Sequence, residues 1–349
     1  ASSSRPVDLS AVATSIMHEL TGFLRKANKS LRENALAALT ALISSHRTAL
    51  QDPDVQPVVI EAATLINEED LHLATLSVNL LTRIASSADA FPGAAREIST
   101  TALSLVLGLS RSPLVQRQTS KSLQELYTSI VNAQIVPYQK LLDDVFAIQG
   151  IDETSSQFVA HNLAKCAAAV CIAAGASATN ATMEALLLKL KTASGIEALF
   201  TLLCIGEIGR LTDLSASKDL ETIMFSAFDS YGDDVKGASA LALGRVAVGN
   251  RDTYLPLIMS KLKEENVVHQ YSLLQALREV ILVGNLSDQE SSGILAILFS
   301  HARSSEEGVR NVVAECLGRL AGSDPVKLVQ ELHNRFDQSA DPLEKATLV

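Results

Sequence analysis

The sequence predicts an all-α solenoid, in which antiparallel helix pairs stack one after another along the chain. Segments with one shared apolar pattern recur through its 349 residues, and internal repetition of this kind is typical of stacked helical units. Apolar residues make up 47% of the chain but aromatic residues only 4%, which suits helices packed at close, regular spacing. Nine prolines and 17 glycines are too few for the many turns of an all-β protein of this length.

The repeated pattern has an aliphatic anchor, a basic residue at the next position, and Leu eight positions after the anchor. Its clearest copies begin at Leu31, Val235 and Val309, and the last two are 74 residues apart, which is two repeats of 37. At helical spacing the apolar positions fall on one stripe, which a helix pair can bury only against a neighbouring pair. We therefore expect the repeat core to be anchored by Leu31, Leu39, Val235, Leu243, Val309 and Leu317.

Weaker copies of the pattern fill the gaps. They begin near residues 72, 115, 158, 197 and 269, so that the eight starts are spaced by 34 to 43 residues. Ankyrin and tetratricopeptide signatures are absent from the sequence, and two helices per period favour HEAT over armadillo repeats. We predict a HEAT-repeat α-solenoid of about eight repeats in a single continuous array over residues 1–349, at approximately 8–50, 53–89, 91–133, 135–176, 178–212, 216–250, 253–284 and 287–322, with an incomplete repeat at 325–349.

Each repeat is expected to begin with a shorter amphipathic helix, which precedes the helix that carries the pattern. Such first helices are predicted at 53–67, 217–229, 254–263 and 325–336. The turns that follow them are polar, and their acidic side chains are favoured by the dipole of the next helix. Two stretches rich in small or polar residues, 174–182 and 284–292, are predicted to be loops between helices.

The basic residue beside each anchor has two interpretations. Arg32, Lys236 and Arg310 either contact a partner or form a charge ladder with acidic groups of neighbouring repeats, and we favour the ladder. Asn311, next to Arg310, is a candidate contact of the same kind.

The residue types that carry catalysis or metal binding form no recognisable group in the sequence. The seven histidines have no metal-ligand spacing to each other or to a cysteine, and neither GxSxG nor GxxxxGK[ST] occurs. The nearest glycine motif, Gly206 to Gly209, lies inside a helical pattern, where close helix packing explains it better than phosphate binding. We expect a protein that is not an enzyme and that has no cofactor, metal or small-molecule substrate.

The net charge and the cysteine content indicate which classes of partner and which cellular compartment suit the chain. A formal net charge of −10 without a long Lys/Arg cluster counts against nucleic acid and anionic membranes as partners. No apolar run reaches the roughly 18 residues of a membrane span without a charged or polar break. The chain starts without Met and stops inside a helical pattern, so we expect a piece of a longer protein. Small buried side chains in a reducing compartment are expected for Cys166, Cys171, Cys204 and Cys316.

Several segments resemble one family of HEAT-repeat proteins. The most specific is EEGVRNVVAECLG at 306–318, and VGN at 248–250 followed by YLP at 254–256 is the next. Both are similar to central and C-terminal repeats of the cullin-associated, neddylation-dissociated proteins, or CAND proteins. The resemblance covers most of the chain and extends to shorter segments at 23–26, 111–114 and 270–274.

The resemblance implies a role in the regulation of ubiquitin ligases. CAND proteins wrap the cullin–RING scaffold when it lacks its ubiquitin-like modifier and eject the substrate receptor, which regulates the assembly of SCF ligases. The implied partner is thus a cullin–RING heterodimer in the cytoplasm and nucleus, and the chain resembles the middle of the family's superhelix. The alternatives are other HEAT scaffolds: karyopherins, against which the absence of Trp counts, and phosphatase scaffolding subunits, whose repeats are more uniform.

Overall fold

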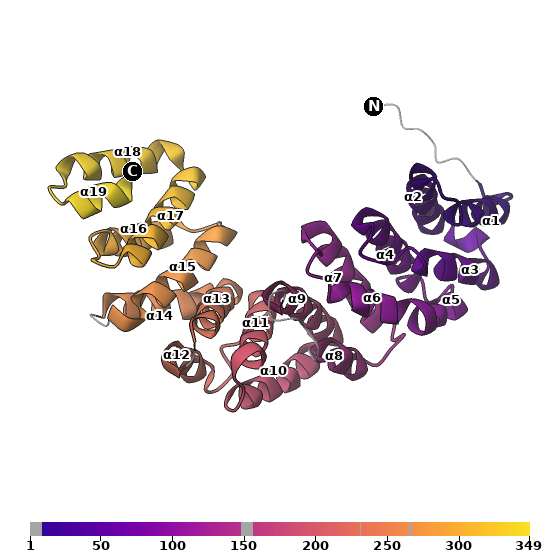
Figure 1. The fold of residues 1–349 in the computed structure, drawn as a ribbon, viewed down its shortest axis with the longest axis horizontal. Helices are drawn as coiled ribbons and strands as arrows, with labels where there is room; N and C mark the ends of the chain where they lie inside the picture. The colour runs from indigo at the N-terminus through magenta and orange to yellow at the C-terminus, as the bar shows by residue number, and fades with distance from the viewer. Residues whose placement is uncertain (1–8, 148–155, 231, 265–266) are drawn as a thin grey trace. The chain divides into compact units, whose positions relative to one another are not determined.

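The computed structural model describes residues 9–147, 156–230, 232–264 and 267–349, and every regular element in these ranges is a helix (Figure 1). The chain divides into two compact units, residues 1–179 and 180–349. In each unit the helices form pairs, and each pair stacks on the next. The predicted all-α fold of stacked helix pairs is confirmed.

In the first unit, the second helix of each pair packs against the second helix of the next pair. α2 contacts α4, α4 contacts α7, and α7 contacts α9, while the first helices α1, α3 and α5 contact one another in the same order. The unit therefore has two layers of helices. Its elements are α1 (Ala13–Leu24), α2 (Lys29–Ser45), η1 (Arg47–Ala49), α3 (Asp52–Ala63), α4 (Leu71–Ala85), α5 (Pro92–Glu97), η2 (Ile98–Ala102), α6 (Leu103–Ser110), α7 (Arg117–Asn132), α8 (Tyr138–Phe146) and α9 (Ser156–Ala174).

Polar caps start α2 and α4. The side chain of Asn28 accepts a hydrogen bond of 3.1 Å from the backbone three residues later, at the start of α2. Asp70 accepts hydrogen bonds from the backbone of His72 and Leu73 at the start of α4. Both side chains satisfy N–H groups that a helix cannot pair internally. The third pair is less regular, because Pro92 starts a short α5 and the π-helical segment η2 joins it to α6.

The second unit repeats the arrangement of the first. α11, α13, α15 and α17 are successive second helices, each in contact with the next, and α12, α14 and α16 pack on the second helix of their own pair. Both α18 and α19 contact α17. The elements are α10 (Ala176–Leu190), in which the boundary of the units falls, α11 (Gly195–Leu211), α12 (Leu220–Ser230), α13 (Asp233–Gly249), α14 (Arg251–Lys263), η3 (Val267–His269), α15 (Gln270–Val283), α16 (Asp288–His301), α17 (Glu307–Ser323), α18 (Pro325–Gln338) and α19 (Pro342–Leu348).

Glycines let the second helices of this unit approach one another closely. A Cβ atom added to Gly206 of α11 would lie 2.8 Å from the Cα of Ala242 in α13, and one added to Gly209 would lie 2.5 Å from an α13 side chain. A Cβ atom on Gly244 of α13 would lie 2.4 Å from the carbonyl oxygen of Ala276 in α15. These distances are too short for any side chain, so the sequence prediction of close helix packing at Gly206 and Gly209 is confirmed.

The two stretches predicted to be loops hold a loop only in part, at Gly175 in the first and at 284–287 in the second, and the prediction is wrong for the rest. Within 174–182 only Gly175 interrupts the helices, with a φ of 93°, and α10 begins at the next residue. Within 284–292 the loop ends at Ser287, which caps α16 through a reciprocal capping box with Glu290. Alanine has the highest helix propensity and serine is a preferred N-cap, so both compositions start helices rather than prevent them.

The predicted first helices are present with shifted ends. They correspond to α3, α12, α14 and α18, and α3 ends four residues before the predicted end at 67. The polar residues that follow form the next turn, in which the side chain of Asn67 accepts a 3.0 Å hydrogen bond from the backbone of Glu69. The nine predicted repeat ranges each hold one helix pair, and their assembly into a single continuous array stays a prediction.

One helix of the described residues, α9, is long and apolar enough to cross a membrane by length and composition. Of its 18-residue window, 56% is buried, and the helix packs against α7 and α8. It therefore has the surroundings of a core helix. As predicted, the four cysteines of the chain are all buried, two of them in this helix.

Candidate interaction surface

Arg32 and Arg310, which are predicted to contact a partner or a neighbouring repeat, form hydrogen bonds within their own repeat, and a partner contact by either stays a prediction. The Nε of Arg32, near the start of α2, donates to the carbonyl of Lys26 in the preceding turn. Nη1 of Arg310, near the start of α17, donates to the carbonyls of Ser304 and Ser305 at 2.8 and 3.0 Å. In both repeats an acceptor lies six residues before the arginine. The guanidinium therefore closes the turn between the first and second helices of the pair.

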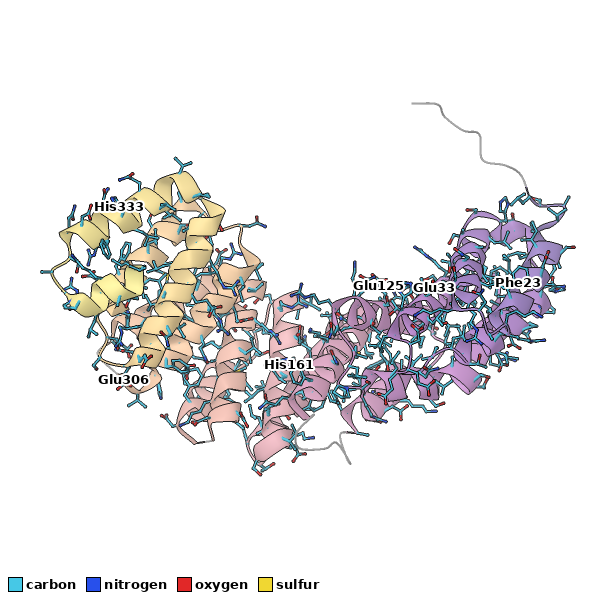
Figure 2. All side chains as sticks on the ribbon, turned by 45° about the horizontal axis from the view of Figure 1, so that its top comes forward. Phe23, Glu33, Glu125, His161, Glu306 and His333 are labelled. Atoms are coloured by element: carbon cyan, nitrogen blue, oxygen red, sulfur yellow. The ribbon has the colours of Figure 1, made fainter. Side chains whose placement is uncertain are left out.

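The other two predicted contacts lie on second helices of the second unit. Lys236 is half-buried on α13, and the turn before it includes residue 231, which lies outside the described residues. Asn311 is exposed on α17, one turn after the N-cap residue Glu306, which Figure 2 shows at the start of that helix. A partner contact by either residue stays a prediction.

The predicted core anchors are placed in the interior of the pairs. Leu39, Val235, Leu243, Val309 and Leu317 are all below 5% exposed, whereas Leu31, in the first turn of α2, is half-buried.

Ion pairs do join the second helices of the second unit, but other residues form them. Arg245 of α13 lies 2.9 Å from Glu207 of α11, between Nη1 and Oε1, and 3.9 Å from Glu279 of α15, between Nε and Oε2. Arg278 of α15 lies 3.2 Å from Glu315 of α17, between Nη1 and Oε2. We call this row the ion-pair ladder; with the flanking arginines it consists of Glu207, Arg210, Arg245, Arg278, Glu279, Glu315 and Arg319.

Four members of the ladder occupy one equivalent position in successive repeats. Glu207, Arg245, Glu279 and Arg319 each lie ten residues after the start of a copy of the sequence pattern, at 197, 235, 269 and 309. Their charges alternate in sign along the unit. Sequence reasoning missed them because it considered only the position next to the anchor. A comparison of charges at every position across the copies would have found them.

The ladder changes from buried to exposed along the unit. The side chain of Glu207 is 1% exposed and those of Arg245 and Glu279 are each 14% exposed, whereas that of Glu315 is 38% exposed. Burial raises the pKa of Glu279 above its ordinary value, against the opposing effect of the nearby arginines. A hydrogen bond from Arg319 lowers the pKa of Glu315. The buried end therefore serves the stacking of the helices, and the exposed end can meet a partner.

Exposed apolar residues accompany the exposed end of the ladder. Tyr271 is 45% and Leu282 is 44% exposed on α15, at helical spacing from Arg278. On α17, Asn311 and Arg319 lie at helical spacing on either side of Glu315. Aromatic residues and arginines of this kind are enriched in protein interfaces. We call this area the second-helix surface; it consists of Tyr271, Arg278, Leu282, Asn311, Glu315 and Arg319.

Among the described residues, no three His, Cys, Asp or Glu side chains are grouped so that they could hold a metal ion.

Helix pairs that stack each on the next through their second helices define a HEAT-like α-solenoid, a class of scaffold protein. The crystal structure of Kap121p bound to RanGTP has this fold: it is 13% identical, with a TM-score of 0.53 over 97% of this chain and 37% of that chain. At this identity the likeness concerns the fold alone. No protein-family model matches the chain.

Several curated proteins are similar to nearly the whole of this chain. "Cullin-associated NEDD8-dissociated protein 1" of Arabidopsis thaliana is 35% identical over 354 residues, which cover 98% of this chain and 29% of that protein. The protein of the same name from Drosophila melanogaster is 33% identical over 373 residues, 100% of this chain and 29% of that protein. "Cullin-associated NEDD8-dissociated protein 1, C-terminal part" of Emericella nidulans is 27% identical over 88% of this chain and 28% of that protein.

The chain is thus homologous, over nearly its whole length, to a part of the cullin-associated NEDD8-dissociated proteins. The resemblance to CAND proteins inferred from the sequence is confirmed. The chain spans 29% of the length of the Arabidopsis and Drosophila relatives.

Proposed function

We propose that the chain is a non-catalytic scaffold segment through which a CAND-type protein holds a cullin–RING complex. The observation that carries this proposal is the 33–35% identity, over nearly the whole chain, to proteins named as cullin-associated and NEDD8-dissociated. In this proposal the protein binds a cullin that lacks its ubiquitin-like modifier, displaces the substrate-receptor adaptor, and so regulates SCF ligase assembly.

The second-helix surface is the part of the chain that we propose to contact the cullin–RING complex. It combines an exposed tyrosine, an exposed leucine and two arginines, a composition that binds proteins well. The chain's net charge of −10 would steer it toward basic regions of the partner. A solenoid without a catalytic group can act on an assembly by competing for its surface, because binding one conformation or composition more tightly shifts the population toward it.

Size-exclusion chromatography tests the proposal. The protein, at its natural length, is mixed with an unmodified cullin–RING pair and, as the matched control, with the same pair carrying the ubiquitin-like modifier. Co-elution with the unmodified pair alone, together with faster exchange of the substrate receptor, is the expected result. Absence of co-elution combined with an unchanged rate of receptor exchange would contradict the proposed function.

A pair of variants tests the proposed surface separately. Tyr271→Ala removes an exposed aromatic side chain from α15, and truncation of such a contact weakens binding by about tenfold when it is central to an interface. Leu188→Ala, at a side chain that is 69% exposed on α10, is the control and should leave binding unchanged. Equal affinities of the two variants would remove this face from the proposal while leaving the scaffold function in place.

We also propose that the protein works in the reducing cytoplasm and nucleus. Four buried cysteines support this compartment, because buried thiols serve there as small apolar side chains. Fractionation of cells with an antibody against the protein tests it, and secretion into the medium would contradict it.

A further inference from the structure

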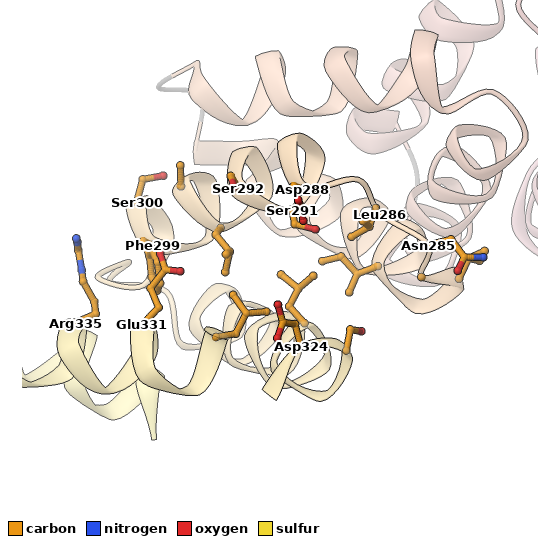
Figure 3. A pocket seen from close by; sticks show the side chains of 18 of the residues that line it. Asn285, Leu286, Asp288, Ser291, Ser292, Phe299, Ser300, Asp324, Glu331 and Arg335 are labelled. Carbon is orange, nitrogen blue, oxygen red and sulfur yellow. The ribbon is translucent and has the colours of Figure 1, made fainter. Parts of the chain in front are cut away.

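A groove runs between two first helices of the second unit, α16 and α18. It encloses about 1070 Å³ and is floored by α17 and the end of α15. Figure 3 shows Asp288, Ser291 and Ser292 on the side of α16, with Asp324, Glu331 and Arg335 on the opposite side. The previous first helices, α14 and α16, contact each other directly, so the groove is a local opening of the first-helix layer.

One end of the groove is held by a fixed arrangement of charges. The guanidinium of Arg335 lies 5.3 Å from the ring centre of Phe299 on α16, and its Nε donates to Glu344 of α19 at 2.7 Å. Arg303 also reaches Glu344, with 3.2 Å between Nε and Oε2, and the side chain of Glu344 is only 2% exposed. These contacts tie α16, α18 and α19 together at this end. Both arginines of the groove are therefore already paired with a buried carboxylate.

The floor of the groove is apolar. Leu295 of α16 and Leu328 of α18 are each 6% exposed, and Leu320 of α17 lies between them at 3%. Ala296, which also lines the groove, is exposed. An apolar side chain placed here would lose contact with water on several sides.

The rim of the groove is acidic. Asp288 and Glu331 contribute two negative charges, and the two arginines contribute two positive charges against the one negative charge of Glu344. The formal charge of these five side chains together is −1. The negative potential lies on the rim, next to the apolar floor. The groove is therefore complementary to a ligand with a positive charge beside an apolar group.

We propose that this groove binds a segment of a partner protein in which Lys or Arg stands beside a large apolar residue. The apolar side chain lies on the leucine floor, and the basic side chain pairs with Asp288 or Glu331 on the rim. The volume is at the upper limit of small-ligand sites, which are typically about 300–1,000 Å³, and the rim is exposed along two helices, so the shape favours a peptide segment. The proposal does not depend on the cullin function, since it rests on the groove alone.

Fluorescence anisotropy with a labelled 12-residue peptide of leucine and lysine tests the proposal. Ala296→Trp fills the open part of the groove and should weaken binding at least about tenfold, while Ala185→Trp, at an exposed alanine of α10, should not change it. Glu331→Gln should weaken binding by about two- to fivefold, whereas Glu184→Gln on α10 should leave it unchanged. The same peptide with glutamate in place of lysine should not bind.

A second measurement tests the groove without a substitution that fills it. The four cysteines of the chain are buried, so a dye attached to Ser292→Cys would report from the rim of the groove without competing sites. Its emission should shift when the lysine peptide is added, and a dye on Ser226→Cys of α12 should stay unchanged. Each of three results would overturn the proposal. The first is an equal loss of binding in the two tryptophan variants, and the second is an unchanged emission of the dye on Ser292→Cys. The third is a concentration-dependent dimer that Ala296→Trp abolishes.

Discussion

At the scale of single residues, the buried end of the ion-pair ladder carries the sharpest stability prediction. Glu207 is 1% exposed and faces Arg245 at 2.9 Å, so Glu207→Ala leaves a largely buried guanidinium without its nearest carboxylate. We expect local opening of α11 and α13 to become easier by about 2–4 kcal/mol. Hydrogen exchange of peptides from these two helices measures the change.

The double variant is the control for this prediction. Arg245→Met in the Glu207→Ala background removes the unpaired charge. The free-energy cost of the double variant should therefore be smaller than the sum of the costs of the two single variants. Strict additivity would show that the two side chains do not interact, in contradiction to the short distance between them.

Glu344 links stability to pH at the same scale. Burial alone would raise the pKa of this carboxyl, but hydrogen bonds from Ser339 and Arg335 outweigh it and hold the pKa below the ordinary value. The folded protein therefore favours the carboxylate more than the unfolded chain does. Its contribution is complete above the ordinary Glu pKa of about 4.3 and is lost as the pH falls through the lowered value.

We expect Glu344→Gln to destabilise the second unit by about 1.5–3 kcal/mol at pH 6, because a charged hydrogen-bond acceptor is lost. The difference from the unchanged protein should begin to shrink as the pH falls below the ordinary Glu pKa of about 4.3, and it should vanish only below the lowered pKa of Glu344, where both proteins carry a neutral group. Urea unfolding at pH 3.5 to 6 measures it. The raised pKa of Glu279 acts in the opposite direction but is common to both proteins. A difference that persists unchanged at low pH would contradict the role of the ionised carboxyl.

At the scale of helices, two glycines of α13 offer a matched comparison. A Cβ atom on Gly244 would lie 2.4 Å from a backbone oxygen of α15, so Gly244→Ala must push the helices apart and should cost about 1–3 kcal/mol. A Cβ atom on Gly237 meets nothing within 4 Å, and Gly237→Ala should stabilise the helix by roughly 0.5–1 kcal/mol. Thermal unfolding of the two variants should therefore shift in opposite directions. Stabilisation by both would contradict the close approach.

The helices themselves could be predicted from the sequence because their signals are local. Apolar spacing and the caps act within a few residues, and the main local errors came from composition: the alanine-rich stretch before Met183 was predicted as a loop, although alanine favours helices. The turn-closing role of Arg310 could not be predicted, since the same residue type suits a partner contact, a ladder or a carbonyl. The groove beside Phe299 depends on the distance between two helices, which the pattern of either one does not contain.

At the scale of the whole molecule, solenoid architecture makes stability a sum of local terms. Leu243 is 1% exposed in α13, and Leu243→Ala should cost about 2–5 kcal/mol through the cavity it leaves. We expect lost hydrogen-exchange protection in α11, α13 and α15, and unchanged protection in α2 and α4 of the first unit. Uniform loss of protection along the chain would show a single cooperative unit instead.

The alternating signs of the ladder restrict how the array can change in length. If α14 and α15 were deleted as one helix pair, α13 and α17 would become neighbouring second helices. Arg245 and Arg319 would then place positive charges at the same position of both helices. If α12 to α15 were deleted as two pairs, Glu207 would meet Arg319, and opposite charges would face each other again. The variant that lacks one helix pair should therefore be less stable than the variant that lacks two, although it has lost fewer residues. The melting temperatures of the two variants measure the difference. If the melting temperatures follow this order, the stack in this part of the chain has a parity as well as a period.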